Sequence, residues 1–533
     1  MSEVKEVPNN TELKRQESSG HYVDGQERLS SEAARLEQLG YAQELPREFS
    51  IWSMMALCMC LMATWEALSA VLGSAIVNGG APCLFYNYVL SFICTIAITC
   101  SLGEIASIYP TAGGQYHWVA ALAPSATKSA AAWFTGWISI GGQVVLTASA
   151  AFAAALQIQG LAILNNNAYV PERYQAMLIF WLILVYSAAM NIWGHKLLPS
   201  VNLLSAVLHV VGFLAIFITL AVMAPKNTSS FVFAEVMNSS GWSSDGVSWL
   251  VGLLSAVYPF LGYDAACHMA EEIPNASRNV PIAMVGSSVV NGLIGLAYCI
   301  ILLYSTGPVD DLFTTVTGFP FMQIFLYATK SNVGATILSL TITLTAVAAT
   351  VAGVASTSRT VWAFARDAAT PFHRALSVVD GHNEVPTAAI VVVTVLQMLL
   401  GFIYLGNSTA FNAILAMAII GMYLSYVLPI CYMLVHGRPR LLSTADYGPF
   451  RLGRGLGIVC NVISVIWLVV SIVFSTFPSA MPVTAETMNY SSVVMAGWMV
   501  FGAAYYFARG RKNFRVPEVR MTNVVVGVQL SQK

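Results

Sequence analysis

Two carboxylates interrupt long apolar stretches of this chain, and packing alone does not explain them. Glu66 and Asp264 each lie fifteen residues into an apolar segment, 51–78 and 249–272 respectively. A carboxylate in hydrocarbon costs several kcal/mol unless it is paired, solvated or protonated. Glu66 is therefore a candidate to bind the cationic amine of a substrate or a coupled proton. The alternative is a protonated side chain that bridges two helices.

The segment around Asp264 also contains residues that break helices. Pro259 and Gly262 precede the acid, and the apolar run then continues to Glu271 and Glu272. Hydrocarbon offers no partner to freed backbone groups, so a broken helix is stable only where it faces protein or a watery cavity. Discontinuous helices form the usual substrate sites of secondary transporters, because their exposed N–H and C=O groups bind polar groups. The alternative is an ordinary proline kink with a buried, neutral Asp264.

The composition indicates the class of protein that holds these acids. Of the 533 residues, 57% are hydrophobic and only 10% are charged, whereas about 25% of residues are charged in a typical soluble protein. We therefore expect an all-α polytopic membrane protein that contacts the lipid bilayer, and the net charge of −1 gives no sign of nucleic-acid binding. Twelve apolar segments are long enough to cross a bilayer: 51–78, 84–108, 131–157, 174–193, 200–223, 249–272, 282–305, 335–363, 387–405, 410–434, 457–477 and 491–508.

Basic residues indicate how these segments are oriented. If the N-terminus is cytosolic, 22 of the 25 Lys and Arg residues fall on the cytosolic side, which is the side that positive charge favours. We expect a disordered cytosolic tail at 1–48 without the apolar core of a signal peptide, a twelve-helix domain at 49–509 and a second cytosolic tail at 510–533. The expected location is the plasma membrane.

Glycosylation sequons provide a second, weaker indication of orientation. The sequon at Asn275 would be cytosolic and unmodified. Four others fall in loops that this topology places outside, and they begin at Asn227, Asn238, Asn407 and Asn489.

The chain also shows signs of internal symmetry. Glu66 and Asp264 occupy equivalent depths in the first and sixth segments, as inverted repeats predict. This symmetry suggests one repeat at 49–223, a second at 249–434 and two appended helices within 457–508.

Three short motifs resemble a known family. They are Thr-Trp-Glu-Ala-Leu-Ser at 64–69, Pro-Thr-Ala-Gly-Gly-Gln at 110–115, which fits a loop that folds back against the bundle, and Glu-Glu-Ile-Pro-Asn-Ala-Ser-Arg-Asn-Val-Pro at 271–281. Over about residues 45–510 the chain closely resembles the amino acid/polyamine/organocation (APC) permease superfamily, and most of all its fungal amino-acid/choline branch, which is GABA permease-like. The resemblance implies a LeuT-like fold with a 5+5 inverted repeat, and transport by alternating access.

The same resemblance implies where the substrate would bind. In these permeases the unwound parts of spans one and six hold the substrate. The matching break in span one is expected, beside Glu66, at Ala67, Leu68 and Ser69, where many relatives have a glycine-serine-glycine triplet. The matching positions in span six are Phe260, Leu261, Gly262, Tyr263 and Asp264.

Other polar residues are candidates for substrate contact and ion coupling. Gln143 follows two glycines in the third segment and is a candidate hydrogen-bond partner of the substrate, although close helix packing explains the glycines equally well. In some proton-coupled relatives a lysine of span five replaces a bound sodium ion, and His209 is the nearest titratable counterpart here. The alternatives are a hydrogen-bonded core histidine and sodium coupling through Ser356, Thr357 and Ser358.

Three acids lie where cytosolic helix ends are expected. Glu104, Glu271 and Glu272 are predicted to pair with bases such as Arg278 or Lys128 and so latch an inner gate. Solvated helix ends would explain them equally well.

These features predict a permease for small amine-bearing solutes such as amino acids, GABA or choline, with a proton or sodium as the possible coupling ion. Glu66 would meet the positive charge, and helix N-termini any substrate carboxylate. The alternatives are export of an amine or alkaloid-like metabolite and, in a different class, a nutrient sensor that does not transport. The sequence has no nucleophile with its base, metal cluster, phosphate loop or cofactor fingerprint, so we expect neither an enzyme nor a cofactor.

Overall fold

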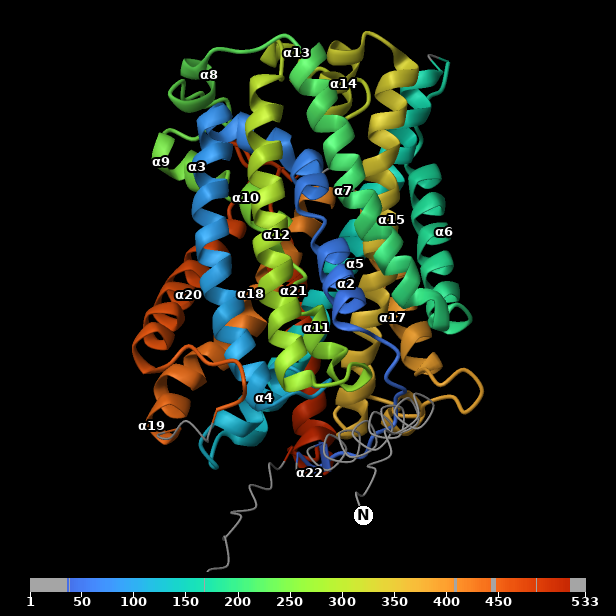
Figure 1. The fold of residues 1–533 in the computed structure, drawn as a ribbon, viewed down its shortest axis with the longest axis vertical. Helices are drawn as coiled ribbons and strands as arrows, with labels where there is room; N and C mark the ends of the chain where they lie inside the picture. The colour runs from blue at the N-terminus through green and yellow to red at the C-terminus, as the bar shows by residue number, and fades with distance from the viewer. Residues whose placement is uncertain are drawn as a thin grey trace, which may run out of the picture.

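A computed structural model describes residues 36–517 except 38, 167, 407–409, 442–446 and 486. Within these residues the chain is all helical, without strands (Figure 1), and ten of its helices are long and apolar enough to cross a membrane. The main helices are α2 (Ile51–Met62), α3 (Thr64–Ile108), α5 (Lys128–Asn165), α6 (Arg173–Ile192), α7 (Leu198–Met223), α12 (Ala276–Tyr304), α15 (Asn332–Arg366), α17 (Thr387–Gly406), α18 (Ala410–Tyr432), α20 (Arg454–Ser475) and α21 (Ser491–Tyr505).

Ten candidate spans differ from the twelve predicted segments for two physical reasons. The first candidate runs from Ile51 to Ile108 and contains two predicted segments, because two helical stretches of α3 join directly at a kink where Gly79 and Gly80 have non-helical φ and ψ. Figure 1 shows the ribbon of α3 turning at one end of the molecule and running back. The predicted segment 249–272 is absent from the ten because it is broken into pieces too short to count.

The outer faces of the helices are apolar. In α7 the buried residues follow one stripe that includes His209, Gly212 and Ile216, whereas Leu204 and Val211 on the other face are exposed. A helix with an apolar exposed face is stable in lipid but not in water. The described structure is therefore that of a multi-pass membrane protein.

The break in the first predicted span lies earlier than the sequence indicated. Ala63 adopts a left-handed conformation (φ 42°, ψ 49°) between α2 and α3, and the Ala67 amide donates to the Ala63 carbonyl at 2.7 Å. The expected break at Ala67, Leu68 and Ser69 is wrong, because these residues lie within the regular helix α3. The left-handed conformation of a non-glycine residue costs about 1 to 2 kcal/mol. The packing of the surrounding helices must offset this cost.

The break in the sixth predicted span is confirmed at the predicted residues. Helices α9 (Asp245–Val251) and α10 (Leu254–Val257) and the turn η2 (Tyr258–Phe260) lead to an extended Leu261 and to Gly262 with φ 110°. The chain then resumes as α11 (Ala265–His268) and η3 (Ala270–Glu272). Only glycine fits at 262, because an added Cβ would lie 2.8 Å from Leu61 Cγ. The two breaks therefore touch each other.

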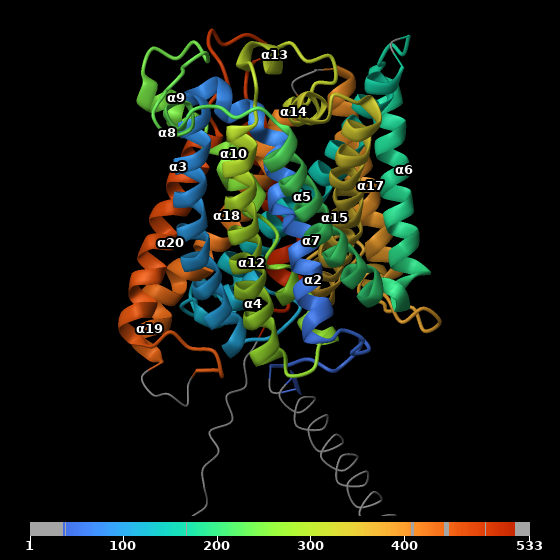
Figure 2. The ribbon, with the colours of Figure 1, turned by 45° about the horizontal axis from the view of Figure 1, so that its top comes forward.

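The loop that follows α3 folds back into the bundle, as predicted. Residues 110–120 are all buried, and α4 (Gln115–Leu122) packs against α5 and α18. Figure 2 shows α4 at the end of the bundle where α19 (Arg438–Arg440) lies. The short helices α8 (Ser229–Phe233), α13 (Val309–Phe313) and α14 (Pro320–Thr329) lie at the opposite end.

Candidate functional site

A small cavity lies between the two helix breaks. Its volume is about 40 Å³, which is room for roughly three water molecules. Most of its lining is apolar, and two polar side chains, Glu66 and Gln157, reach it. The lining residues are Leu61, Met62, Ala63, Glu66, Ala67, Ala70, Leu146, Ala150, Ala153, Gln157, Tyr258, Leu261, Ile342, Ala346 and Ala349.

Glu66 lies at the cavity wall with half of its carboxylate satisfied. Its Oε1 lies 2.8 Å from Nδ1 of His209, and both side chains are buried, with 2% and 0% exposed. Because a carboxylate oxygen accepts, Nδ1 must carry the proton of the imidazole. Glu66 Oε2 has no hydrogen-bond partner among the described residues, and neither has His209 Nε2. The sequence thus identified both residues, and the structure pairs them.

The helix break determines where Glu66 lies. Because α3 begins at Thr64, Glu66 falls in its first turn, where the positive end of the helix dipole favours a negative charge. Trp65 packs against the His209 ring with centroids 5.8 Å apart and holds the ring beside the carboxylate. A break at Ala67 would have placed Glu66 outside this turn.

Gln157 supplies a second free acceptor at the cavity, and the sequence analysis missed it. Its Oε1 is buried without a hydrogen-bond partner among the described residues. The available signal was a lone amide within an apolar segment. Two unpaired acceptors in one cavity leave a site that a hydrogen-bond donor or a cation would complete, because each unmatched buried oxygen carries a desolvation cost.

The other residues predicted to bind substrate lie in different places. Ala67 lines the cavity. Leu68 is buried in the core, and the Ser69 hydroxyl contacts the Tyr298 hydroxyl at 2.6 Å. Phe260 packs on Phe92 with parallel rings 5.9 Å apart. The structure therefore brings Ala67 to the cavity and places the other three side chains in helix packing.

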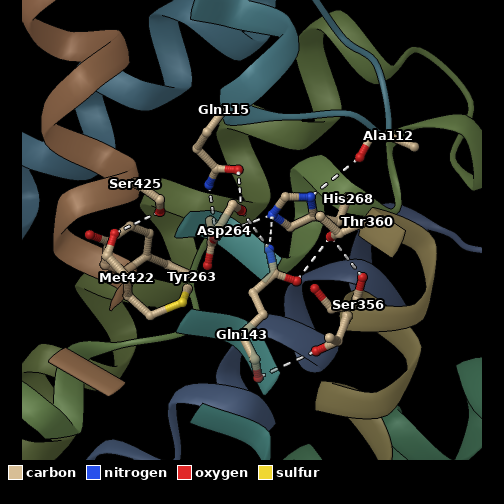
Figure 3. Close-up of polar contacts among 12 residues, drawn as sticks. Ala112, Gln115, Gln143, Tyr263, Asp264, His268, Ser356, Thr360, Met422 and Ser425 are labelled. Atoms are coloured by element: carbon tan, nitrogen blue, oxygen red, sulfur yellow. Dashed lines mark hydrogen bonds and ion pairs between the residues drawn. The ribbon is translucent and has the colours of Figure 1, made fainter. Parts of the chain in front are cut away.

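Asp264 belongs to a second buried cluster, shown in Figure 3. Its Oδ2 accepts from Gln115 Nε2 at 2.8 Å and lies 3.2 Å from Nε2 of His268. Nε2 of Gln143 lies 2.9 Å from the same His268 nitrogen, and the Thr360 hydroxyl donates to Gln143 Oε1 at 2.9 Å. All five side chains are buried. Asp264 and Gln143, each predicted to contact substrate, thus both contact His268, and neither is among the residues that line the cavity beside Glu66.

The Pro-Thr-Ala-Gly-Gly-Gln motif builds one wall of this cluster. The Ala112 carbonyl lies 3.3 Å from His268 Nδ1, and Gln115 contacts Asp264. Gly114 has φ 55°, and an added Cβ would lie 2.7 Å from His268 Cε1, so the ring fits only against glycine. The sequence analysis missed His268 and Gln115; the available signal for His268 was a histidine four residues after Asp264 on a helix.

Tyr263 and the glycines of α5 serve the packing around this cluster. The Tyr263 ring lies 5.4 Å from the Tyr426 ring, and its hydroxyl has no partner among the described residues. A Cβ at Gly142 would lie 2.6 Å from the backbone of Gly421 on α18. The glycine pair before Gln143 therefore allows close helix packing, which was the alternative explanation for these glycines.

The three predicted gate acids are paired, but with other bases than those expected. Arg366 binds Glu271 through two nitrogens, at 2.9 and 3.0 Å, and Arg359 Nε donates to Glu272 at 2.8 Å. The prediction that Arg278 would pair with them is wrong, because Arg278 is exposed and the end of α15 brings in the two other arginines.

Glu104 forms a separate buried pair. Its carboxylate binds Arg438 and accepts from the Leu452 amide at 2.8 Å, and Arg438 also donates to Asn461 at 3.0 Å. The expected partner Lys128 is instead the first residue of α5. Pairing of all three acids excludes the alternative of solvated helix ends.

A carboxyl group beyond the end of α15 anchors the N-terminal segment. Asp367 accepts from Tyr41 at 3.0 Å and from Tyr116 at 2.9 Å. Burial raises the pKa of Asp367 to about 6. The Phe49 amide also donates to the Glu272 carbonyl at 3.1 Å. The segment before α2 therefore closes this end of the bundle.

The described sequon asparagines use their amide nitrogens internally. Asn227 donates to the Leu303 carbonyl at 3.0 Å, Asn238 to the Trp242 carbonyl at 2.9 Å and Asn489 to the Ser475 carbonyl at 2.7 Å. Asn407 lies outside the described residues. N-glycosylation stays a prediction at all four positions, and in this conformation the three described nitrogens are already engaged.

The protein is a multi-pass membrane protein in which two helix breaks touch. A cavity and a buried acid lie between these breaks and form a polar site. Residues 49–501 match the family model described as amino acid permease, and the chain belongs to this family. It is 32% identical over 476 residues to a choline transporter of Saccharomyces cerevisiae, covering 89% of this chain and 83% of that protein.

Other relatives agree with this assignment. The chain is 34% identical over 443 residues to a putative amino acid/polyamine transporter of Macrophomina phaseolina, which covers 82% of this chain and 97% of the relative. It is 31% identical over 504 residues to an amino-acid permease of Arabidopsis thaliana, with 92% and 96% covered. The predicted resemblance is confirmed, and the family consists of permeases and not of enzymes.

Proposed function

We propose that this permease is a secondary active transporter of a small organic cation, which binds Glu66 in the cavity between the two helix breaks. The observation that carries the proposal is the unpaired Oε2 of Glu66 at the cavity wall. With one proton on the imidazole, at Nδ1, the pair has a net charge of −1, and the buried Nε2 of His209 has no acceptor among the described residues for a second proton. A bound ammonium group would neutralise that buried charge.

The geometry favours an amine without a carboxylate. In an amino-acid site of this kind, a substrate carboxylate would occupy the positive end of the interrupted helix. Here the first turn of α3 already contains the carboxylate of Glu66, and a second negative charge there would be repelled. The free Gln157 oxygen also requires a donor or a cation. We therefore place choline-like amines first, and amino acids and GABA second.

Relatives support both substrate classes. One is named a choline transporter, another a putative amino acid/polyamine transporter and a third an amino-acid permease. Export of an amine metabolite uses the same site and the same alternating access, and it remains the alternative direction of flux.

The proposed architecture has twelve crossings. They form two inverted repeats, 49–223 and 249–434, followed by two helices within 457–508, with both termini cytosolic in the plasma membrane. The break at Ala63 and the break at Leu261–Asp264 support it, because they interrupt the first helix of each proposed repeat.

The test is transport by the purified protein in proteoliposomes. Radiolabelled choline, GABA and a set of amino acids are supplied singly, and excess unlabelled compound is then used as competitor. We expect saturable choline uptake, with weaker competition by zwitterions than by other monovalent amines. The proposal fails if no labelled amine enters faster than it enters protein-free liposomes. Release from preloaded vesicles then tests the export direction.

A further inference from the structure

We propose that Asp264 and His268 form the proton-binding site that couples transport, so that one proton moves with each cation. This inference rests on the proposed function and names its coupling ion. It assigns the proton to the second buried cluster and not to His209, which the sequence analysis considered.

The geometry of the cluster favours one proton between Asp264 and His268. The Ala112 carbonyl can only accept, so the proton of neutral His268 lies on Nδ1. Nε2 is then a bare acceptor, and it faces Asp264 Oδ2 at 3.2 Å. Two lone pairs at this distance repel each other. A proton on Oδ2 removes this repulsion. Oδ2 then donates to Nε2, shares the single lone pair of that nitrogen with the Gln143 N–H₂ group at 2.9 Å, and still accepts from Gln115.

The first acid and histidine pair differs in this respect. In Glu66 and His209 the imidazole N–H can point at the carboxylate, so Oε1 of the ionised acid is satisfied without an added proton. Its other oxygen has no partner among the described residues, and the residue lines the cavity where a cation would bind. The two pairs therefore have separate tasks: Glu66 provides the charge for the substrate, and Asp264 holds the proton.

The groups that face Asp264 and His268 include no cation among the described residues. Gln115 on α4, Gln143 on α5 and Thr360 on α15 surround the pair as neutral polar groups. The titratable neighbours are weak acids: Cys58 on α2, Tyr426 on α18, and Tyr263 and Cys267 next to the pair in sequence. Loss of the proton thus leaves one buried carboxylate that no Lys or Arg of the described structure compensates.

Release of the proton should loosen the second helix break. The pair follows directly after Leu261 and Gly262, and its contacts attach α11 to α4 and α5. In the step proposed here, Asp264 Oδ2 takes up one H⁺ from the outer side and the cluster closes. The O–H bond breaks on the inner side, the proton leaves to water, and repulsion between Oδ2 and Nε2 separates α11 from its partners.

The experiment measures proton and choline movement together. Proteoliposomes contain a trapped pH-sensitive dye, potassium and valinomycin hold the membrane potential at zero, and the outside is made more acidic than the lumen. For the wild type we expect choline to accumulate above its external concentration while the lumen acidifies. In Asp264→Asn the amide N–H₂ group replaces the hydrogen-bond donor of the protonated acid but cannot release a proton. For this variant we expect neither accumulation of choline nor acidification of the lumen. Choline exchange at equal pH should stay within about threefold of the wild type, because exchange needs no net proton movement.

Two further variants keep the test decisive. Gln115→Leu removes the donor that stabilises the ionised Asp264, so the pH of half-maximal accumulation should rise by about one unit. An unshifted midpoint would overturn the inference even if Asp264→Asn does not fold. His117→Gln is the matched control: His117 is a buried histidine of α4 whose pKa is lowered to about 3 by burial, and its replacement should leave proton-driven accumulation intact.

The possible failures are distinguishable. Accumulation by Asp264→Asn with the pH dependence of the wild type would overturn the inference. Wild-type choline exchange without any effect of the pH gradient would also overturn it and leave the proposed function standing. If the wild type neither exchanges nor takes up choline, both proposals fail.

Discussion

Replacing Glu66 with glutamine should weaken choline binding strongly while preserving the fold. In Glu66→Gln the amide oxygen can still accept from His209, which lies 2.8 Å away, so the buried pair survives. The group that faces the cavity changes from a negative acceptor to an N–H₂ donor. A bound cation then loses its counter-charge and meets a group that repels it.

The size of the effect follows from the burial of the site. At an effective dielectric constant of about 20, two unit charges interact by about 4 kcal/mol at about 4 Å and by about 3 kcal/mol at about 5.5 Å. The quaternary ammonium group of choline has no N–H, so this charge attraction alone sets the effect. With about 1.4 kcal/mol for each tenfold change, Kd for choline should increase between about 150-fold and about 700-fold.

Equilibrium binding of radiolabelled choline to purified protein measures this change directly. The neutral isostere 3,3-dimethylbutan-1-ol, used as competitor, should bind wild type and variant with similar, weak affinity, because it has no charge to lose. Glu235→Gln removes an exposed acid and should leave Kd unchanged. If Glu66→Gln binds choline within about threefold of the wild type, the carboxylate is not the counter-ion and the reasoning about its free oxygen is refuted.

Three further predictions concern stability. Arg359→Met should lower the free energy of unfolding by about 3 to 5 kcal/mol because Glu272 is left buried and unpaired, and the double change with Glu272→Met should recover part of the loss in thermal unfolding. Burial raises the pKa of Asp367 to about 6 from 3.8. The neutral carboxyl group therefore adds to the free energy of unfolding in full below about pH 4, and this contribution is lost as the pH rises through 6. That contribution is about 3 kcal/mol, and Asp367→Asn should flatten this part of the pH dependence of the unfolding temperature. Gly262→Ala should lower the free energy of unfolding by about 1 to 3 kcal/mol, because residue 262 has a positive φ and a close contact with Leu61. Gly246→Ala is the control and should be tolerated, because its added Cβ would lie 3.8 Å from the nearest atom. Equal unfolding temperatures for the two variants would contradict the predicted strain at Gly262.

Properties that depend on nearby residues could be predicted from the sequence. The length and apolarity of the segments predicted a helical membrane protein, because the bilayer requires about 20 apolar residues for each helical crossing. Pro259 and Gly262 predicted the second break, since proline lacks an N–H and glycine accepts a positive φ. The Pro-Thr-Ala-Gly-Gly-Gln motif similarly predicted a loop that folds back into the bundle.

Properties that depend on which helix faces meet were decided by the tertiary structure. The first break falls on Ala63, a residue without any helix-breaking tendency of its own. Glu66 meets His209 across 143 positions of the chain, and Glu271 and Glu272 meet arginines of α15 and not the nearby Arg278. A side chain's distance along the chain does not limit its contacts, whereas the rotation and crossing of each helix do, and these are determined by the packing of the whole bundle.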